Sequence, residues 1–359
     1  MSIVSSNGNG RIKVLVVDDS PMMCKAIEKI LNEDEQIEVA ARALSGKEAL
    51  NALSNKKFDV CTLDVHMPGM NGLSVLKNIM VKFPVPTLMV SAFTGDGSKI
   101  TFEALRFGAV DFFKKPARSG DGKMEEQASS LRNKLKRASK VQVRAARYLR
   151  VSPAVSRVSK EKDSLDRSSE GINRLCIIYG STGAYSSILS IVPFLSYLPG
   201  GPVVVSMGIG EENLSAFVDY LQPYSLCPLS MATDGVELLP SHIYFLPVNH
   251  AAHFDRAGKT WEMAVKERPI ESSREGAIDL TLLSASESFG RELLSIFVSG
   301  DCNYGLTGAK EVLRNKGNVL VQKPAGCLAP FNPELFIKEF NVPWAEPGEI
   351  SKKVNDWMK

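Results

Sequence analysis

Three aspartates stand where two short apolar runs of the sequence end. Asp18 and Asp19 follow the run at 12–17, and Asp64 follows the run at 58–63. If these runs are parallel strands of one sheet, their carboxyl ends meet at the same edge and the three carboxylates converge. Converging carboxylates repel one another unless a cation joins them, and oxygen ligands favour Mg²⁺. A carboxylate beside such an ion can attack a phosphoryl group and form an aspartyl phosphate.

Two further residues suit the stabilisation of a transferred phosphoryl group. Lys115 follows the apolar run at 110–113 and can supply positive charge. Ser91 ends the run at 86–91 and can supply a hydroxyl donor. Because a transferred phosphoryl group needs both positive charge and hydrogen-bond donors, these residues strengthen the prediction of phosphoryl chemistry.

A second motif, in the C-terminal half, is typical of a nucleophilic serine. Ser181 lies in YGSTGA (179–184), which follows an apolar run and opens a helical pattern. The N–H groups of such a helix start can stabilise an oxyanion. A serine hydroxyl attacks only when a base takes its proton, whereas a serine at this place can also simply cap the helix. The histidines of the chain are His66, His242, His250 and His253.

The alternation of apolar runs and helical patterns predicts how the first set of residues is positioned. Five strands alternating with helices imply a doubly wound parallel sheet with right-handed crossovers. The apolar runs lie at 12–17, 37–42, 58–63, 86–91 and 110–113. The helical patterns lie at about 21–32, 46–54, 71–82 and 98–107.

A second α/β domain is predicted from residue 173 onward. Its apolar runs are RLCIIY, GPVVVSM, HIYFLP, LSIFVSG and NVLVQ. Two domains suit 359 residues, because single cores rarely grow past about 250 to 300 residues. Between the domains, a helical pattern leads into a segment rich in serine and charge, which is typical of a linker. The stretch 132–150 holds eight basic and no acidic residues, and it is interpreted as a solvated helix face or as a docking stripe for an acidic partner.

Composition places the chain among globular proteins without a membrane span. Net charge is +3 and 44% of the residues are hydrophobic. The six cysteines form no CxxC pair, which predicts free thiols in a reducing compartment. The polar N-terminal stretch is not typical of a signal peptide, and no run approaches the roughly 18 apolar residues of a membrane span. We therefore predict a cytoplasmic protein.

The first half of the chain resembles the receiver domain of bacterial response regulators. VVDDS, LDVHMPGMNG, VSA, and KKP after DFF all match in order and spacing. The resemblance implies a flavodoxin-like fold in which Asp64 is the phosphoacceptor. It also implies that Asp18, Asp19 and the backbone carbonyl of His66 join Asp64 in holding Mg²⁺.

The same resemblance implies that other residues of the domain change position when Asp64 is phosphorylated. Ser91 and Phe112 would form a switch pair that moves when the phosphate arrives, and Lys115 would contact the phosphate. A sensor histidine kinase would supply the phosphoryl group.

The second half is similar to the methylesterase domain of the chemotaxis protein-glutamate methylesterase (CheB) family. GSTGA, ATDGVELLPSHIYFLP, SGDCNYGLTGAKEV and QKPAGCLAPFNP match in order and spacing. The resemblance implies a Rossmann-like α/β domain controlled by the receiver. In that family the domain removes methyl esters from receptor glutamates and deamidates certain glutamines.

The catalytic triad of that family is incomplete in this sequence. Ser181 matches the serine, but Gly208 stands at the histidine position and Tyr304 at the aspartate position. The Arg-Pro-Ser stretch of the family also departs to EGA before Asp279. Glycine offers no base, and tyrosine, with an ordinary pKa of about 10, stays neutral near pH 7. We therefore expect a catalytically impaired domain that acts by binding a partner.

Two other functions remain open at the level of sequence. A relocated triad that joins Ser181 to Asp301 and to His250 or His253 would give an active methylesterase and glutamine deamidase. A DNA-binding regulator is a third class, supported only by the basic stretch at 132–150.

The predicted organisation has three segments. Residues 10–122 form the receiver, residues 123–171 form a helix and linker, and residues 172–359 form the methylesterase-like domain. The implied partners are a CheA-like sensor histidine kinase and chemoreceptors or other chemotaxis proteins, with neither membrane insertion nor nucleic acid favoured.

Overall fold

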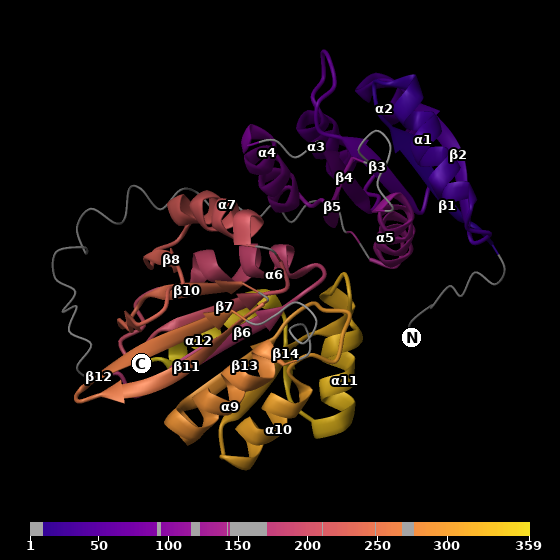
Figure 1. The fold of residues 1–359 in the computed structure, drawn as a ribbon. Coiled ribbons are helices and arrows are strands. Elements are labelled where there is room, and N and C mark those ends of the chain that lie inside the picture. Colours follow the sequence, from indigo (N-terminus) through magenta and orange to yellow (C-terminus); the bar gives the residue numbers. More distant parts are fainter. Residues whose placement is uncertain are drawn as a thin grey trace. The chain divides into compact units, whose positions relative to one another are not determined.

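Two separate parallel sheets organise the chain (Figure 1). They belong to two compact units, Met1–Leu149 and Arg150–Lys359. The computed structural model describes residues 10–91, 95–115, 123–141, 143, 171–209, 211–247, 249–267 and 276–359. Within the predicted helix and linker at 123–171, residues 151–170 therefore lie outside the described residues.

The first unit contains a five-stranded parallel sheet of order β2-β1-β3-β4-β5. Its strands are β1 (Ile12–Val17), β2 (Ile37–Ala43), β3 (Val60–Asp64), β4 (Thr87–Ser91) and β5 (Asp111–Lys114). Every residue of β3 and β4 is buried, as expected when helices cover both faces of a parallel sheet. The prediction of a flavodoxin-like, doubly wound sheet is confirmed, and β1 and β3 are neighbours at its switch point.

The helices of the first unit begin at polar residues that the sequence supplies at the right places. They are α1 (Pro21–Asn32), α2 (Gly46–Asn55), α3 (Gly72–Lys82), α4 (Gly95–Arg106) and α5 (Lys123–Ala138). Ser20, Ser45 and Asn71 each accept a hydrogen bond from the backbone N–H three residues later. These side chains satisfy N–H groups that the first turn of a helix leaves without partners.

Helix α5 packs on the first unit. Leu131 and Leu135 are fully buried, and α5 contacts α1, β4 and β5. Arg132 binds the carboxylate of Glu33 at 2.8 Å, beside the end of α1. The described part of the basic stretch thus forms ion pairs within its own unit, which weakens the interpretation as a docking stripe there.

The second unit is built on a seven-stranded parallel sheet of order β15-β14-β13-β6-β7-β10-β8. Its strands are β6 (Leu175–Gly180), β7 (Val203–Met207), β8 (Leu229–Met231), β10 (Ile243–Pro247), β13 (Leu293–Phe297), β14 (Asn318–Gln322) and β15 (Trp344–Ala345). The chain runs outward from β6 through β7 and β10, then returns to place β13 on the other side of β6. The switch point of this sheet therefore lies between β6 and β13.

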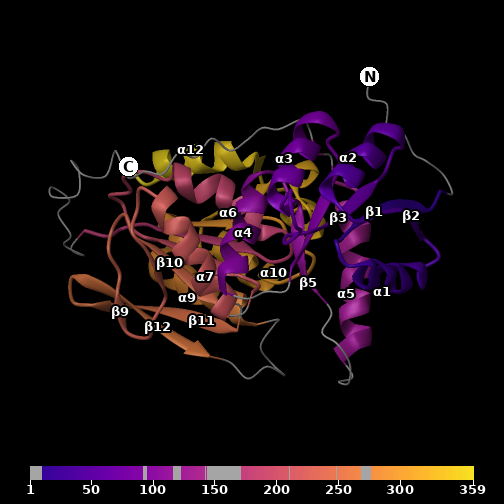
Figure 2. The ribbon, with the colours of Figure 1, turned by 90° about the horizontal axis from the view of Figure 1, so that it is seen from above.

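A three-stranded antiparallel sheet accompanies the parallel one, and the sequence patterns did not predict it. It consists of β9 (Val236–Glu237), β11 (His250–Ala257) and β12 (Thr260–Glu267), in the order β11-β12-β9. Figure 2 shows these strands together at one side of the second unit. The remaining helices are α6 (Ala184–Ile191), α7 (Glu211–Leu221), α9 (Ala277–Phe289), α10 (Leu306–Arg314), α11 (Phe331–Phe340) and α12 (Pro347–Trp357).

Hydroxyl groups of helix α9 form hydrogen bonds with the backbone of the edge strand β11, on the side where no further described strand of its sheet pairs with it. Thr281 accepts a hydrogen bond from the N–H of Ala252 at 2.9 Å, and Ser284 accepts one from the N–H of Phe254 at 3.0 Å. Ser288 donates to the carbonyl of Phe254 at 2.9 Å. Since an open strand edge invites pairing with other chains, these contacts protect β11.

Two expectations from the composition concern the cysteines and membrane-spanning helices. The six cysteines are free, as expected, and all but Cys302 are buried. In the part of the chain that the structure describes, no helix combines the length and apolar character needed to cross a membrane.

His242 connects the stability of the second unit to pH. Its Nε2 lies 2.9 Å from the Ser230 hydroxyl, and its ring stacks on Tyr244 at 4.4 Å. Burial lowers the pKa of His242 from 6.5 to about 4. As pH falls through this window, the unfolded chain takes up a proton that the folded chain does not. The free energy of unfolding therefore falls with falling pH.

We predict that His242→Gln reduces this pH dependence. Between pH 7 and pH 4.5 the wild type should lose about 1–2 kcal/mol more stability than the variant, allowing for partial exposure of the ring. Urea unfolding followed by tryptophan fluorescence measures this, because Trp261, Trp344 and Trp357 are the tryptophans of the chain and all lie in the second unit. His253→Gln, at an exposed histidine, is the matched control. Equal pH slopes for wild type and His242→Gln would contradict the assignment.

Candidate functional site

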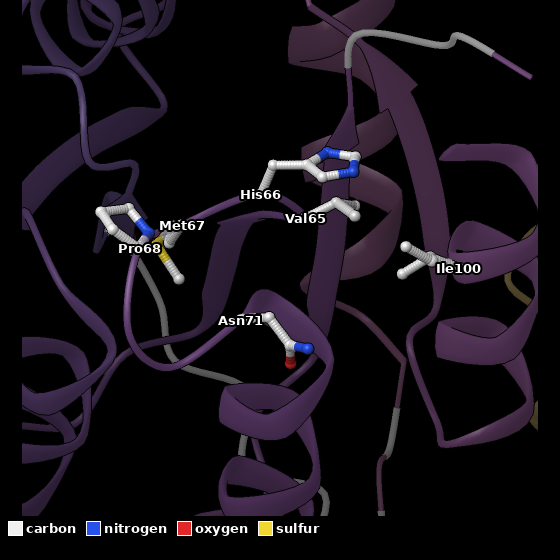
Figure 3. A pocket seen from close by; sticks show the side chains of 6 residues that line it. All are labelled: Val65, His66, Met67, Pro68, Asn71 and Ile100. Carbon is white, nitrogen blue, oxygen red and sulfur yellow. The ribbon is translucent and has the colours of Figure 1, made fainter. Parts of the chain in front are cut away.

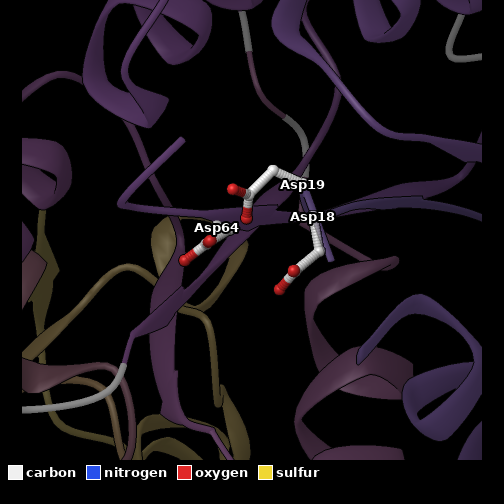
Figure 4. A group of neighbouring side chains, drawn as sticks. All are labelled: Asp18, Asp19 and Asp64. Atoms are coloured by element: carbon white, nitrogen blue, oxygen red, sulfur yellow. The ribbon is translucent and has the colours of Figure 1, made fainter. Parts of the chain in front are cut away.

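The three predicted aspartates meet at the carboxyl edge of the first sheet. Asp18 and Asp19 follow β1, and Asp64 ends β3 (Figure 4). One ligand atom from each carboxylate lies within 4.8 Å of the other two. Asp18 and Asp64 are buried, whereas Asp19 is exposed, so the cluster opens to solvent on one side.

Lys115 bridges the two buried carboxylates. Its Nζ lies 2.8 Å from Oδ2 of Asp18 and 2.9 Å from Oδ2 of Asp64. Burial raises the pKa of Asp64 even though the ammonium opposes this effect. Burial alone would lower the pKa of Lys115, but the two carboxylates outweigh it and hold that pKa above its ordinary value. The lysine therefore stays charged between them.

The donor set of this cluster fits a hard divalent cation. Three carboxylates converge beside one ammonium, which leaves an excess of two negative charges. The buried Oδ2 atoms of Asp18 and Asp64 share this single ammonium between them. A further cation would compensate the remaining charge, and an all-oxygen donor set suits Mg²⁺.

The turn after β3 is shaped by close backbone contacts. A Cβ atom on Gly72 would lie 2.0 Å from the carbonyl oxygen of Asp64, so only glycine fits there. The N–H of His66 donates to Oδ1 of Asp64 at 3.3 Å, which orients the carboxylate. The His66 side chain is exposed, consistent with a backbone role for this residue.

A cavity of 340 Å³ adjoins this turn. Figure 3 shows its lining residues on the segment after β3 and on α4. They are Val65, His66, Met67, Pro68, Asn71 and Ile100. The lining is mainly apolar, so the cavity differs in character from the charged cluster beside it.

The two predicted switch residues lie on the neighbouring strands of the same sheet. Ser91 ends β4 and is buried. Phe112 lies on β5, which pairs with β4, and its ring meets the ring of Phe102 edge-on at 6.3 Å. Parallel pairing thus brings Ser91 and Lys115 to the same edge of the sheet as Asp64, with Phe112 on the strand beside Ser91.

Ser181 lies at the switch point of the second sheet. It follows β6, and its N–H donates to the carbonyl of Ser299, beyond the end of β13, at 3.0 Å. The N-cap of α6 is Gly183, in a left-handed conformation (φ 80°) and with no side-chain cap. The alternative that Ser181 caps this helix is therefore wrong, because the turn inserts two residues between the serine and the first helical residue.

The hydroxyl of Ser181 contacts the loop that follows β13. It donates to Oδ1 of Asp301 at 3.3 Å, and the N–H of Asp301 donates back to it at 3.4 Å. The Sγ of Cys302 lies 3.7 Å away. Burial raises the pKa of the Cys302 thiol, so this residue supplies neither a thiolate nor a base near pH 7.

Gly208 lies directly against Ser181. Its N–H donates to the carbonyl of Gly180 at 2.8 Å. A Cβ atom at this position would come within 2.8 Å of the Cβ of Ser181 and 3.0 Å of its Cα. The position therefore adjoins the serine, as the resemblance implied, but this backbone leaves no room there for a larger side chain.

Tyr304 and Asp279 have structural roles around the loop that follows β13. Tyr304 packs against the hydrophobic core of the unit. The Asp279 carboxylate accepts hydrogen bonds from the N–H groups of Gly305 at 3.2 Å and Gly308 at 2.7 Å, at the start of α10. Burial raises the pKa of Asp279 in spite of these bonds. Asp279, on α9, thus ties its helix to the start of α10.

The candidate histidines are not among the partners of the Ser181 hydroxyl in the described residues. His250 Nδ1 lies 2.9 Å from Oδ1 of its neighbour Asn249. His253 pairs with Asp255 at 3.3 Å, on an exposed part of β11. Of the residues considered for a relocated triad, Asp301 forms a hydrogen bond with Ser181 in the structure.

Sequence reasoning missed three residues that shape this site. Ser299 donates to the carbonyl of Thr182 at 2.7 Å, and Cys302 adjoins the serine. Asn332 is fully buried and donates to the carbonyls of Cys302 and Tyr304 at 3.1 and 3.3 Å. The available signal was the presence of polar residues at the end of the run LSIFVSG, directly after it, and within FNP, where parallel strands converge.

Family models match both units of the chain. Residues 14–124 match the response regulator receiver domain, and residues 176–354 match the CheB methylesterase domain. Together these matches cover the two sites just described.

Similar proteins share nearly the whole length of the chain. A protein-glutamate methylesterase/protein-glutamine glutaminase of Pyrococcus abyssi is 32% identical over 347 residues, covering 94% of this chain and 91% of that protein. A namesake from Thermotoga maritima is 32% identical over 329 residues, covering 91% of this chain and 93% of that protein. The solved response regulator domain of Thermotoga maritima CheB is 41% identical, with a TM-score of 0.34, and covers 37% of this chain and 98% of that one.

The packing of Gly208 on Ser181 generates a prediction about stability. Gly208→Ala should lower the free energy of unfolding of the second unit by about 1–3 kcal/mol, because the new methyl group overlaps the serine. Gly348→Ala is the matched control, since a Cβ there meets no atom within 4 Å. Urea unfolding followed by tryptophan fluorescence compares the two variants. A Gly208→Ala protein as stable as the control would show that the turn has space for a side chain.

Proposed function

The chain belongs to the CheB methylesterase family and carries a response regulator receiver domain before its methylesterase domain, and from this membership we propose that it is a phosphorylation-controlled regulator in a chemotaxis-type pathway. A CheA-like sensor histidine kinase is the proposed phosphodonor. The proposed output partners are chemoreceptors or other chemotaxis proteins, and the proposed location is the cytoplasm.

Asp64 is the proposed phosphoacceptor, and the charge balance around it carries the proposal. Asp18 and Asp19 would hold Mg²⁺ together with Asp64 and the carbonyl of His66. The metal, when bound, would neutralise charge on the phosphoryl oxygens. Lys115, already charged at 2.9 Å from Asp64, would contact the transferred group. Phosphorylation would add negative charge at Asp64, so the ammonium of Lys115 would then be shared between the phosphoryl group and the carboxylates.

Ser91 and Phe112 are the residues proposed to change position when Asp64 is phosphorylated. Ser91 is the last residue of β4, the strand that pairs with β3, and Asp64 lies opposite the preceding Val90. A hydroxyl that donates to a phosphoryl oxygen has to move toward it, and Phe112 on the adjoining strand would then change its position. A coupling of about 1–3 kcal/mol would suffice for regulation.

For the second unit we propose a binding role with impaired catalysis. The Ser181 hydroxyl donates to Asp301, and a carboxylate without a histidine between it and the hydroxyl does not reproduce the general base of a serine triad. Gly208 and Tyr304 offer no base and no charge at the two other positions of the triad. Loss of triad members costs serine hydrolases several powers of ten in rate.

An active methylesterase and glutamine deamidase is the alternative, because the similar proteins are named for both activities. Asp301 beside Ser181 is the observation that favours it. A histidine would still have to approach the pair, and His250 and His253 lie on the antiparallel strand β11 with other partners.

We predict that acetyl phosphate and Mg²⁺ label the wild-type chain with one phosphoryl group. Intact-mass measurement should show its loss in Asp64→Asn and on chelation of the metal. Asp59→Asn, which removes an exposed carboxylate of the same unit, is the control and should be labelled normally. Labelling that persists in Asp64→Asn would refute the assignment.

We also predict that the chain releases no methanol from methylated chemoreceptors above the level of Ser181→Ala. The Thermotoga maritima relative serves as the positive control for the assay. Methanol release by the wild type that is abolished in Ser181→Ala would overturn the impaired-site proposal and favour the alternative.

A further inference from the structure

A lysine of α5 reaches the strand that carries Phe112. The side chain of Lys134 is only 23% exposed, although the rest of its helix is rich in charge. Its Nζ lies 2.5 Å from Oδ2 of Asp111 on β5. The same Nζ donates to the backbone carbonyl of Phe112 at 3.1 Å.

Asp111 completes a clamp around Phe112. Its Oδ1 accepts a hydrogen bond from the N–H of Phe112 at 2.8 Å, while its Oδ2 binds Lys134. Asp111 is 4% exposed, so this ion pair is largely shielded from water. The Asp111–Lys134 pair therefore contacts both polar groups of the Phe112 backbone, in addition to the pairing of β5 with β4.

Lys134 also acts on the aromatic ring. Its Nζ lies 5.7 Å from the centroid of the Phe112 ring, within the range of a cation–π interaction. Phe102 of α4 also contacts the Phe112 ring. The two ring centroids lie 6.3 Å apart, in an edge-on arrangement. The ring thus lies between a cation from α5 and an aromatic ring from α4.

Other cations of α5 make different contacts. Arg132 binds Glu33, and Lys136 binds Asp34 at 2.5 Å, both near the end of α1. These pairs attach the helix to α1, on a different part of the unit. Lys134 therefore differs from its neighbours in contacting the proposed switch residue.

We propose that Lys134 is a positioning residue that holds Phe112 in its present arrangement and so sets how readily the receiver switches. This inference rests on the proposed function, in which Phe112 moves when Asp64 is phosphorylated. If the clamp stabilises the resting arrangement, its loss favours the other one. By linkage, the same loss then tightens binding of a phosphoryl analogue at Asp64.

The test uses the full-length chain with 4-fluorophenylalanine at position 112. Fluorine NMR reports the environment of this ring while beryllofluoride, a phosphoryl mimic, is added with Mg²⁺. In Lys134→Met we expect the resting signal to move toward the beryllofluoride-bound position. The half-saturating beryllofluoride concentration should fall about fivefold.

Three comparison variants separate a switch effect from a general loss of structure. Asp111→Asn weakens the clamp from its other end with little change of shape, and it should act in the same direction as Lys134→Met. Lys134→Arg keeps the charge and should restore the wild-type response. Lys136→Met removes an ion pair of the same helix that lies away from Phe112, and it should leave the signal and the titration unchanged.

The outcomes distinguish the inference from the function on which it rests. A wild-type signal that ignores beryllofluoride overturns the proposed switch at Phe112, and the inference falls with it. A wild-type signal that responds, with Lys134→Met and Asp111→Asn behaving identically to it, overturns the inference alone. An equal effect of Lys136→Met would also overturn it, because the change would then come from loss of helix packing.

Discussion

The convergence of parallel strands at their carboxyl ends determines where chemistry can occur in both units. In the first sheet β1 and β3 are neighbours, so Asp18 and Asp64 face each other. In the second sheet β6 and β13 are neighbours, so the turn at Ser181 meets the loop at Asp301. In each case the chain reverses its direction of strand addition at that point, and the resulting crevice exposes backbone and side chains from two segments distant in sequence.

The two crevices differ in the charges they assemble. The first gathers three carboxylates beside one lysine, an excess of negative charge that a divalent cation would compensate. The second holds a serine, a carboxylate and a thiol whose pKa is raised by burial. The first crevice thus pairs its carboxylates with a lysine, whereas the Ser181 hydroxyl of the second contacts a carboxylate and a thiol and, among the described residues, no histidine.

Most of the first unit was predictable, because its central strands are mainly apolar runs. The runs at 12–17, 58–63 and 86–91 coincide with β1, β3 and β4 within two residues. The antiparallel sheet of the second unit was missed because β11 consists largely of small, polar and charged residues and contains no apolar run. Its edge is completed by hydroxyl groups from α9, a pairing between distant segments that local sequence patterns do not reveal.

The sequence by itself determined the two α/β domains, the three aspartates with Lys115, and the absence of a histidine at position 208, because these follow from residue types and their spacing along strands. Tertiary structure alone decided that a side chain at Gly208 would overlap Ser181 and that Asp279 is used by helix α10. It also decided that Asp111 and Lys134 enclose the backbone of Phe112. These contacts join residues that are far apart in the chain or depend on side-chain direction, and distances of a few ångströms between such groups are fixed only when the sheets and helices pack together.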